Sequence, residues 1–218
     1  MEIGSSRIER LLLAGPAGRM EALLESIPHT PPRMTAVVCH PHPLYGGTMH
    51  TKIVFRAAKS ALSLGFPTLR FNFRGVGKSE GSYAHGKGEQ QDARAALDYL
   101  EARYPDLPVV MMGFSFGSRV GLMVGASDPR VASLVGLGLP VDAWDFSFLR
   151  PVTKPKLIVQ GTEDVYGHRS RLEELFASLR KPKELCWVEG ADHFFTGKTD
   201  EAQAAIRSFL EALSSAPS

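Results

Sequence analysis

Short apolar segments alternate with segments of helical periodicity along most of this 218-residue chain. The clearest apolar segment, Leu107–Gly113, has the sequence LPVVMMG, which is typical of a strand that is covered on both faces. When strands and helices alternate, the strands pair in parallel, because each helix carries the chain back to the starting edge of the sheet. The sequence therefore predicts a single α/β domain over residues 1–218, in which a mostly parallel sheet has helices on both faces.

The predicted sheet has eight strands, or seven. The first two form an antiparallel hairpin over residues 8–25, with Gly15-Pro16-Ala17-Gly18 as its turn. Further strands are predicted at 35–39, 67–73, 107–113, 131–139, 155–160 and 184–188, and helices at 48–64, 89–104, 115–127, 168–180 and 199–213. Reactive groups gather at the carboxyl ends of parallel strands, so we expect chemistry in the loops that follow the strands.

The charge balance argues against several classes of partner. The chain has 25 basic and 23 acidic residues, which gives no electrostatic reason to expect nucleic acid or an anionic membrane. The apolar run Leu11–Ala14 is too short for a secretory signal, which needs roughly 7–15 apolar residues, and no run approaches the ~18 residues of a membrane span. We therefore expect a cytoplasmic protein. Cys39 and Cys186 both fall in predicted strands, so two buried free thiols are expected, and a single disulfide is the alternative.

The segment Gly113-Phe114-Ser115-Phe116-Gly117 follows a strongly apolar strand and begins a predicted helix. It matches the pattern G-x-S-x-G, in which the serine occupies the tip of a sharp turn between strand and helix. The two glycines let strand and helix approach each other without Cβ clashes. The helix N-terminus directs backbone N–H groups at the hydroxyl, where they can stabilise an oxyanion. Ser115 is therefore the predicted nucleophile. The alternative is that the glycines only pack the helix on the strand.

A serine nucleophile needs a general base, and the base needs a group that orients it. Two later loops contain candidates for both. Asp164 ends the segment Gly161-Thr162-Glu163-Asp164, and His193 ends Gly190-Ala191-Asp192-His193; each segment follows a predicted strand. The chain order serine, acid, histidine is the one expected for a nucleophile at such a turn. We predict that Asp164 is the orienting acid and His193 the base. A turn-forming aspartate and a surface histidine are the alternatives.

Three other carboxylates compete with Asp164. Glu163 is adjacent and projects in a different direction. Asp142 follows the strand at 131–139, a position that some hydrolases use for the acid. Asp192 directly precedes His193 and could hardly reach Nδ1 of that residue while leaving Nε2 free for the serine.

These motifs resemble those of the α/β-hydrolase superfamily, in particular its small, lidless members related to dienelactone hydrolases and acyl peptidases. The resemblance covers nearly all of residues 8–213. It implies the α/β-hydrolase fold without a large cap domain, because only residues 140–154 join the two strands between which the family often inserts a helical lid. Its markers are the turn at Ser115, the loops with Asp164 and His193, and the segments His40-Pro41-His42-Pro43-Leu44-Tyr45-Gly46-Gly47 and Phe73-Arg74-Gly75-Val76-Gly77-Lys78-Ser79.

The resemblance also implies an oxyanion hole with one N–H from the Ser115 turn and one from the loop after the third strand. Phe116 is expected to supply the first. Family members usually have His-Gly where this chain has His40-Pro41, and the prolines at 41 and 43 have no N–H to donate. The second donor is therefore His42 or Leu44, and we favour Leu44.

Aromatic residues near these motifs are candidates for substrate binding. We expect His42 and Tyr45, from the loop after the third strand, and Trp144, from residues 140–154, to contact the substrate. Four residues of 140–154 either line an apolar acyl pocket or cover the core: Trp144, Phe146, Phe148 and Leu149.

Two patterns that suggest other chemistry fail on their spacing. Gly77-Lys78-Ser79 is similar to the end of a phosphate-binding P-loop, but position 72 is Asn where that pattern needs Gly, and no helix follows directly. We interpret it as a tight loop in which Arg74 and Ser79 hold the backbone. The histidines at 40, 42 and 50 have no acidic or cysteine partners at the spacing of a metal site, so neither a metal nor a cofactor is expected.

The residues and the resemblance together predict a serine hydrolase that forms an acyl-enzyme on Ser115. The expected substrate is a small-molecule ester or thioester, since an open site suits small or exposed groups, and a carboxylesterase is favoured. A peptidase or amidase of the same fold and a hydrolase-like ligand-binding protein without turnover are the alternatives. Most dehalogenases of this fold have Asp where Ser115 stands, which argues against that branch. We expect a monomer or a homodimer.

Overall fold

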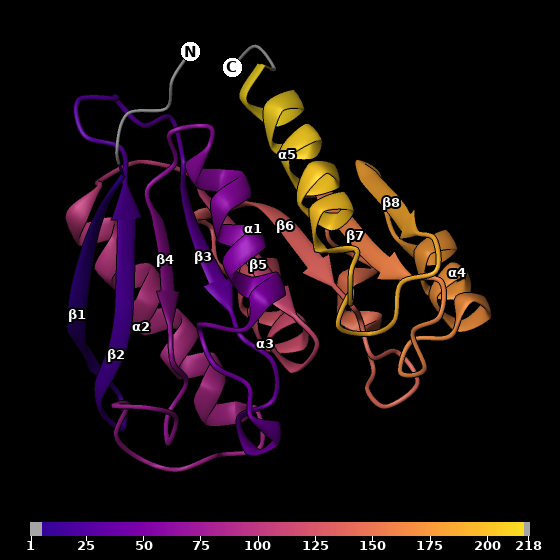
Figure 1. Cartoon of the computed structure of the whole chain (residues 1–218), viewed down its shortest axis with the longest axis horizontal. Helices are drawn as coiled ribbons and strands as arrows, with labels where there is room; N and C mark the ends of the chain where they lie inside the picture. The colour runs from indigo at the N-terminus through magenta and orange to yellow at the C-terminus, as the bar shows by residue number, and fades with distance from the viewer. Residues whose placement is uncertain (1–5, 216–218) are drawn as a thin grey trace.

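The computed structural model describes residues 6–215. One eight-stranded sheet has the strand order β1-β2-β4-β3-β5-β6-β7-β8 (Figure 1). Only β2 is antiparallel to its neighbours β1 and β4, and all other strand pairs are parallel. The predicted mostly parallel sheet with an N-terminal antiparallel hairpin is therefore confirmed, with eight strands. The strands are β1 (Arg7–Gly15), β2 (Gly18–Ser26), β3 (Thr35–Cys39), β4 (Thr68–Phe71), β5 (Val109–Phe114), β6 (Val131–Leu137), β7 (Lys156–Gly161) and β8 (Lys183–Val188).

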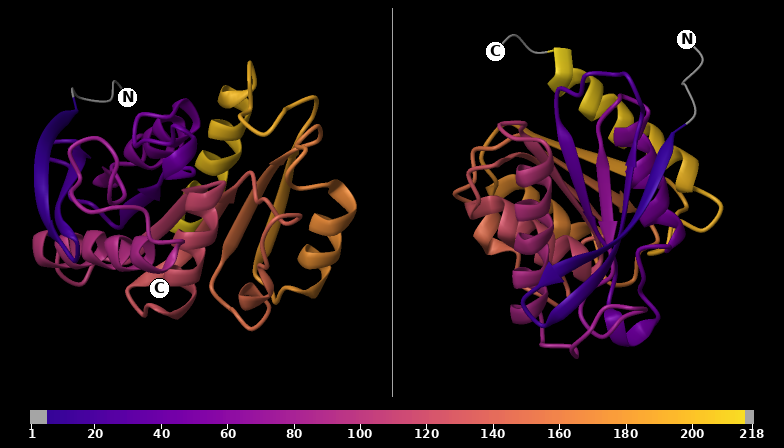
Figure 2. Two further views of the ribbon diagram at one scale, coloured as in Figure 1. Left: turned by 90° about the horizontal axis from the view of Figure 1, so that it is seen from below. Right: turned by 90° about the vertical axis from the view of Figure 1, so that its left-hand side faces the viewer.

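Helices cover both faces of the sheet (Figure 2). α1 and α5 pack on one face, and α2, α3 and α4 pack on the other. Neighbouring residues of β5 contribute to opposite cores: Met111 to the core beneath α2 and α3, Val110 and Met112 to the core beneath α1 and α5. Both faces of β5 are thus buried, which explains its lack of polar positions. The helices are α1 (Lys52–Leu62), α2 (Lys87–Arg103), α3 (Phe116–Ser127), α4 (Arg169–Ser178) and α5 (Thr199–Ser215).

Helix α1 begins later than predicted, at Lys52 rather than at residue 48. The N–H of Thr48 donates to Oγ1 of Thr51 at 3.2 Å, and the N–H of Met49 donates to Oδ1 of Asn72 at 2.9 Å. Side-chain acceptors of this kind offer the backbone an alternative to helical hydrogen bonds. The prediction of a helix over 48–64 was therefore too long, because the competing acceptor at Asn72 is distant in sequence.

The connection between β6 and β7 contains a single 3-10 turn, η2 (Ser147–Leu149). Phe146 and Leu149 are 2% and 1% exposed, and Phe148 packs against the same core. These three side chains therefore cover the core. No cap domain lies within residues 138–155, in agreement with the prediction of a lidless fold.

An ion pair and side-chain hydrogen bonds hold the loop between β4 and α2 against the neighbouring elements. The guanidinium of Arg74 pairs with the buried carboxylate of Asp92 at 2.7 Å. Oγ of Ser79 donates to the carbonyl of Asn72 at 2.7 Å and accepts the N–H of Glu21 at 2.9 Å. The interpretation of this segment as a tight loop held by Arg74 and Ser79 is confirmed.

The two cysteines are free. Cys39 is in β3 and Cys186 is in β8, four strand positions apart in the sheet. At about 4.8 Å per strand this is roughly 19 Å, far beyond the Cα separation of ~4.4–6.8 Å that a disulfide spans. Cys39 is buried as expected, but Cys186 is only half-buried, because β8 is an edge strand.

Across residues 6–215, every helix is too short or too polar to traverse a bilayer.

Candidate functional site

Ser115 occupies the turn between β5 and α3 with φ 54° and ψ −121°. A positive φ is a strained conformation for a residue with a side chain, so the surroundings must hold it. The N–H of Ser115 donates to the carbonyl of Leu137 in β6 at 2.9 Å, and the carbonyl of Ser115 accepts the N–H and the hydroxyl of Ser118 at 2.9 Å and 2.6 Å. The hydroxyl of Ser115 is left at the surface of the turn, where its residue is half-buried.

Glycines on both sides of the turn permit very close backbone approach. A Cβ at Gly113 would lie 2.2 Å from the carbonyl oxygen of Gly117. A Cβ at Gly117 would lie 2.3 Å from the carbonyl oxygen of His40, at the end of β3. The first turn of α3 therefore packs directly against the backbone that follows β3, which places that loop next to Ser115.

The loops after β5, β7 and β8 bring the predicted side chains of Ser115, Asp164 and His193 together, joined by hydrogen bonds. Nε2 of His193 lies 2.9 Å from Oγ of Ser115, and Nδ1 of His193 lies 2.8 Å from Oδ2 of Asp164. His193 is 6% exposed and Asp164 is 4% exposed. In this arrangement Nδ1–H donates to the carboxylate, which leaves Nε2 free to accept the hydroxyl proton of the serine.

The carboxylate of Asp164 has two further donors. Oδ2 accepts a hydrogen bond from Nε2 of Gln160 at 2.7 Å, and Oδ1 accepts the N–H of Tyr166 at 2.8 Å. Gln160 is fully buried at the end of β7, and its Oε1 accepts the N–H of Leu139 at 2.7 Å. The sequence analysis missed Gln160. The available signal was a single amide at the end of the otherwise apolar strand segment LIVQ.

The three competing carboxylates have other surroundings. The carboxylate of Asp142 accepts the N–H of His168 at 2.7 Å and pairs with Nδ1 of that residue at 2.8 Å. Asp192 accepts the N–H of Thr196 at 2.9 Å, and Glu163 is exposed. Of the four candidates, Asp164 is the one hydrogen-bonded to His193 in the described part of the chain.

The loop after β3 presents a different N–H from the one we favoured. The N–H of Leu44 donates to Nδ1 of His42 at 3.2 Å, so this group already has an acceptor. The N–H of His42 has no hydrogen-bond partner among residues 6–215. Phe116 is the first residue of α3, where a helix leaves its N–H groups free. The geometry thus favours the alternative, His42, over Leu44, because the side chain of His42 turns back onto its own loop.

Buried His40 anchors this loop. The N–H of Phe73 donates to Nε2 of His40 at 2.9 Å, and Nδ1 lies 2.6 Å from the carbonyl oxygen of Pro41. A backbone N–H can only donate, so Nε2 is the acceptor and Nδ1 carries the proton. Burial lowers the pKa of His40 to about 4, which keeps the ring neutral at pH 7. Across residues 6–215 no three metal-ligating side chains gather in one place.

Three loops and the first residue of α3 contribute aromatic rings to one group next to the Ser115 turn. The ring of His42 lies at the centre of this group, with centroid distances of 4.6 Å to Tyr45, 4.9 Å to Tyr83 and 6.3 Å to Trp144. It also lies 4.9 Å from the ring of Phe116, the residue after the serine. The structure therefore brings together the three residues predicted for substrate binding and adds Tyr83, which the sequence analysis missed. We call this group the aromatic cluster: His42, Tyr45, Tyr83, Phe116 and Trp144.

A second set of rings surrounds His193. Its imidazole lies 4.7 Å from the ring of Tyr166, 5.1 Å from Phe114 and 5.3 Å from Phe194. Tyr166 and Phe194 are 50% and 57% exposed. Exposed rings thus lie next to His193, and Ser115 itself is half-buried.

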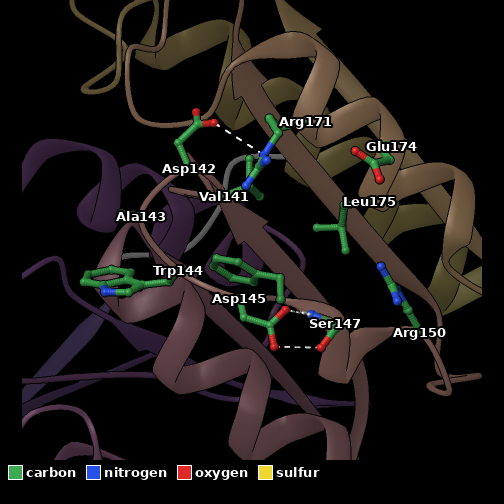
Figure 3. Close-up of a pocket in the computed structure, with 11 residues that line it drawn as sticks. Val141, Asp142, Ala143, Trp144, Asp145, Ser147, Arg150, Arg171, Glu174 and Leu175 are labelled. Atoms are coloured by element: carbon green, nitrogen blue, oxygen red, sulfur yellow. Dashed lines mark hydrogen bonds and ion pairs between the residues drawn. The ribbon is translucent and has the colours of Figure 1, made fainter.

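A hollow of about 380 Å³ lies between residues 141–150 and α4 (Figure 3). Trp144 forms part of its wall, and the side chains of Arg171 and Asp142 point toward each other at one side. Its wall also contains Arg150 and Glu174, so the charges are mixed. Ser115, His193 and Asp164 are not part of this wall.

Comparison with known proteins identifies the family. The sequence pattern of the alpha/beta hydrolase domain matches residues 35–216. The chain belongs to the α/β-hydrolase family. This α/β hydrolase is 36% identical over 210 residues to an uncharacterised protein of Rickettsia prowazekii (strain Madrid E), a match that covers 92% of this chain and 88% of that protein.

Two solved structures are similar to this α/β hydrolase over nearly their whole length. One is a protein of Xanthomonas campestris described as a member of the α/β serine hydrolases without a lid, with 32% identity, full coverage of both chains and a TM-score of 0.88. The other is an α/β serine hydrolase homologue from Coxiella burnetii, with 36% identity, coverage of 92% and 96% and a TM-score of 0.86. The resemblance to lidless members of the superfamily is confirmed.

Proposed function

We propose that this α/β hydrolase is a serine hydrolase that cleaves a small ester or thioester through an acyl-enzyme on Ser115. The observation that carries the proposal is the hydrogen-bonded line from Oγ of Ser115 through His193 to Asp164, with distances of 2.9 Å and 2.8 Å. A free serine hydroxyl is a weak nucleophile at neutral pH, and an oriented imidazole is the group that activates it.

The first half of the reaction acylates the serine. Nε2 of His193 accepts the proton of Ser115 as Oγ attacks the carbonyl carbon. The oxyanion that forms accepts hydrogen bonds from the N–H groups of Phe116 and His42. The imidazolium then gives its proton to the leaving oxygen or sulfur, and the C–O or C–S bond of the substrate breaks.

The second half releases the acid. Nε2 of His193 accepts a proton from water as the water attacks the acyl-enzyme, and the proton passes to Oγ of Ser115 when the carboxylic acid leaves. Asp164 holds the required tautomer and stabilises the imidazolium in both halves. Gln160 and the N–H of Tyr166 keep the carboxylate in place.

The short connection between β6 and β7, which contains no cap domain, supports small or exposed ester and thioester groups as substrates. Exposed rings border the site, and the hollow between residues 141–150 and α4 does not include the nucleophile in its wall. A carboxylesterase is therefore our first choice. Amide or peptide hydrolysis by the same residues is the second candidate.

A fluorophosphonate probe together with p-nitrophenyl esters of increasing acyl length tests the proposal. We expect the full-length protein to be labelled and to turn over the shorter esters. Ser115→Ala should keep the fold, lose labelling and lose at least ~10³-fold in kcat. If the folded wild-type protein is neither labelled nor active, the alternative of a ligand-binding protein without turnover would be favoured. Faster turnover of matched p-nitroanilides than of esters would favour the amidase.

A further inference from the structure

The proposed reaction determines on which side of Ser115 the acyl group lies. Nε2 of His193 must return a proton to the leaving atom, so the leaving group lies next to the imidazole. The acyl group then extends away from His193. The rings that contact His193 are Phe114, Tyr166 and Phe194, none of which belongs to the aromatic cluster. The aromatic cluster therefore lies on the acyl side, where its member Phe116 directly follows the nucleophile.

We infer that the aromatic cluster is the acyl subsite and that it selects esters whose acyl group is a planar aromatic ring. The inference rests on the proposed serine-hydrolase function and adds its substrate class. The loops after β3, β4 and β6 and the first residue of α3 each contribute at least one ring, although these residues are separated by up to 102 positions in the sequence. His42, Tyr83 and Trp144 are half-buried, so part of each ring is accessible.

The chemistry of the cluster favours an uncharged flat group. Burial lowers the pKa of His42 below its usual value, so this imidazole is neutral at pH 7 and the cluster has no charged member. Aromatic pairs prefer offset or edge-to-face arrangements with centroids ~4.5–7 Å apart. The pairs within the cluster already include a stacked one, His42 with Trp144 at 6.3 Å, and an edge-to-face one, Phe116 with Trp144 at 5.7 Å.

A flexible alkyl chain would form less favourable contacts with these rings than a planar ring would. Ligand sites that bury a long apolar group are usually enclosed cavities. The 380 Å³ hollow shares Trp144 with the cluster but has no wall residue from the loops that hold Ser115 and His42. A ring of benzoyl size needs only the accessible parts of His42, Tyr83 and Trp144, whose rings contact Phe116, the residue after the nucleophile.

Two esters separate planarity from size. p-Nitrophenyl benzoate and p-nitrophenyl cyclohexanecarboxylate have the same leaving group and six-membered rings that differ in planarity. Each kcat/KM is divided by the rate of alkaline hydrolysis of the same ester, which removes the difference in intrinsic reactivity. The variants are Tyr83→Leu, Trp144→Leu and Tyr45→Leu. Tyr45 is 85% exposed, so its replacement cannot disturb the core.

We expect the wild-type protein to prefer the benzoate. Each variant should lower the ratio of the normalised kcat/KM for the benzoate to that for the cyclohexane ester by roughly 2–12-fold, the range that an aromatic pair contributes. Phe55→Leu is the matched control, since Phe55 is a partly exposed ring on α1 outside the cluster, and it should change neither ester. The fraction of protein labelled by a fluorophosphonate gives the fraction that is folded and active.

Equal losses on both esters, or an unchanged ratio in all three variants, would overturn the inference while leaving the serine-hydrolase proposal intact. A preference of the wild-type protein for the cyclohexane ester would do the same. A wild-type protein without labelling and without turnover of either ester would overturn both proposals, and the labelling result tells the two failures apart.

Discussion

Among the acidic side chains near His193, Asp164 is distinguished by the number and direction of its donors. Its two oxygens accept hydrogen bonds from the imidazole of His193, the amide of Gln160 and the N–H of Tyr166. A buried carboxylate with several donors is fixed in position and orientation. Asp142 forms a similar pair with His168, but that pair is largely exposed, with 67% of the His168 side chain accessible.

Replacing each aspartate by asparagine tests this difference. Asp164→Asn should lower kcat for p-nitrophenyl acetate by about 10³–10⁴-fold, because an amide stabilises the wrong tautomer of His193. Asp142→Asn is the matched control and should stay within about threefold, since its carbonyl oxygen can still accept the N–H of His168. Similar losses in both variants would contradict the assignment of the acid.

His40 contributes to stability in a manner that depends on pH. The buried ring has a pKa of about 4 in the folded protein, against 6.5 for an ordinary histidine. Between these values the unfolded chain binds a proton that the folded protein does not. As far as this group is concerned, the free energy of unfolding is therefore highest above pH 6.5. It decreases as the pH falls from 6.5 toward 4. The difference of about 2.5 in pKa corresponds to roughly 3 kcal/mol.

Urea unfolding at several pH values between 7 and 4.5 tests this contribution. In His40→Gln, the amide can accept from Phe73 and donate to Pro41 but does not titrate. We expect the variant to be less stable than the wild-type protein at pH 7, with a shallower fall in the free energy of unfolding below pH 6.5. An equally steep fall in the variant would show that other groups cause the acid sensitivity.

At the scale of secondary-structure elements, the contact between α3 and the ends of β3 and β5 positions Ser115, the proposed nucleophile. The helix can approach so closely because glycine occupies its second position, where a Cβ would lie 2.3 Å and 2.4 Å from the carbonyl oxygens of His40 and Cys39. The same approach brings the loop that contains His42 next to the first turn of α3, which begins at Phe116. One packing contact thus sets both the serine turn and the proposed oxyanion hole.

Two glycines of α3 provide a matched test. Gly117→Ala forces a Cβ against backbone oxygens, so we expect a loss of about 3 kcal/mol in the free energy of unfolding and slower labelling of Ser115. At Gly121, one turn later, the nearest atoms are side-chain sulfurs at 3.2 Å and 3.4 Å. Gly121→Ala should stay within about 1 kcal/mol of wild type, because the helix propensity of alanine offsets the tighter contact. Comparable losses in both variants would argue against a special role for the first turn.

At the scale of the whole molecule, the parallel sheet collects the functional loops at one edge. The loops after β3 to β8 supply the aromatic cluster, Ser115, Asp164 and His193, while the helices cover both faces. The same sheet separates the two cysteines, one in central β3 and one in edge β8. Burial raises the pKa of both thiols, and it does so more strongly for Cys39, which is completely buried.

Thiol titration with Ellman's reagent, without reductant, tests this arrangement. The folded protein should react slowly at Cys186 and not at Cys39 over the same period. The thiolate is the reactive form, and burial disfavours the thiolate of both residues, more strongly that of Cys39. Unfolding in guanidinium should expose two thiols per chain. Cys186→Ser should abolish the slow reaction of the folded protein, and fewer than two thiols in the unfolded wild-type protein would contradict the free state of the cysteines.

Much of this architecture follows from local patterns. The apolar run of β5, the glycines around Ser115 and the positions of Asp164 and His193 after strands are properties of contiguous residues, so they predict the sheet and the loops that meet at its edge. Backbone periodicity and turn chemistry act over a few residues, which is why these predictions succeed. The start of α1 was wrong because its competing hydrogen bond comes from Asn72, more than 20 residues away.

Other features depend on which groups become neighbours after folding. The choice between the N–H groups of His42 and Leu44 depended on the direction of one imidazole. Gln160 is only four residues from Asp164, but its amide is oriented by the N–H of Leu139, just after β6. Tyr83 joins the aromatic cluster because Arg74 and Ser79 hold its loop against α2 and β2. The hydrogen bonds of Gln160 with Leu139, of Arg74 with Asp92 and of Ser79 with Glu21 join residues 18 to 58 positions apart. Such partners exist only once the sheet has brought them together.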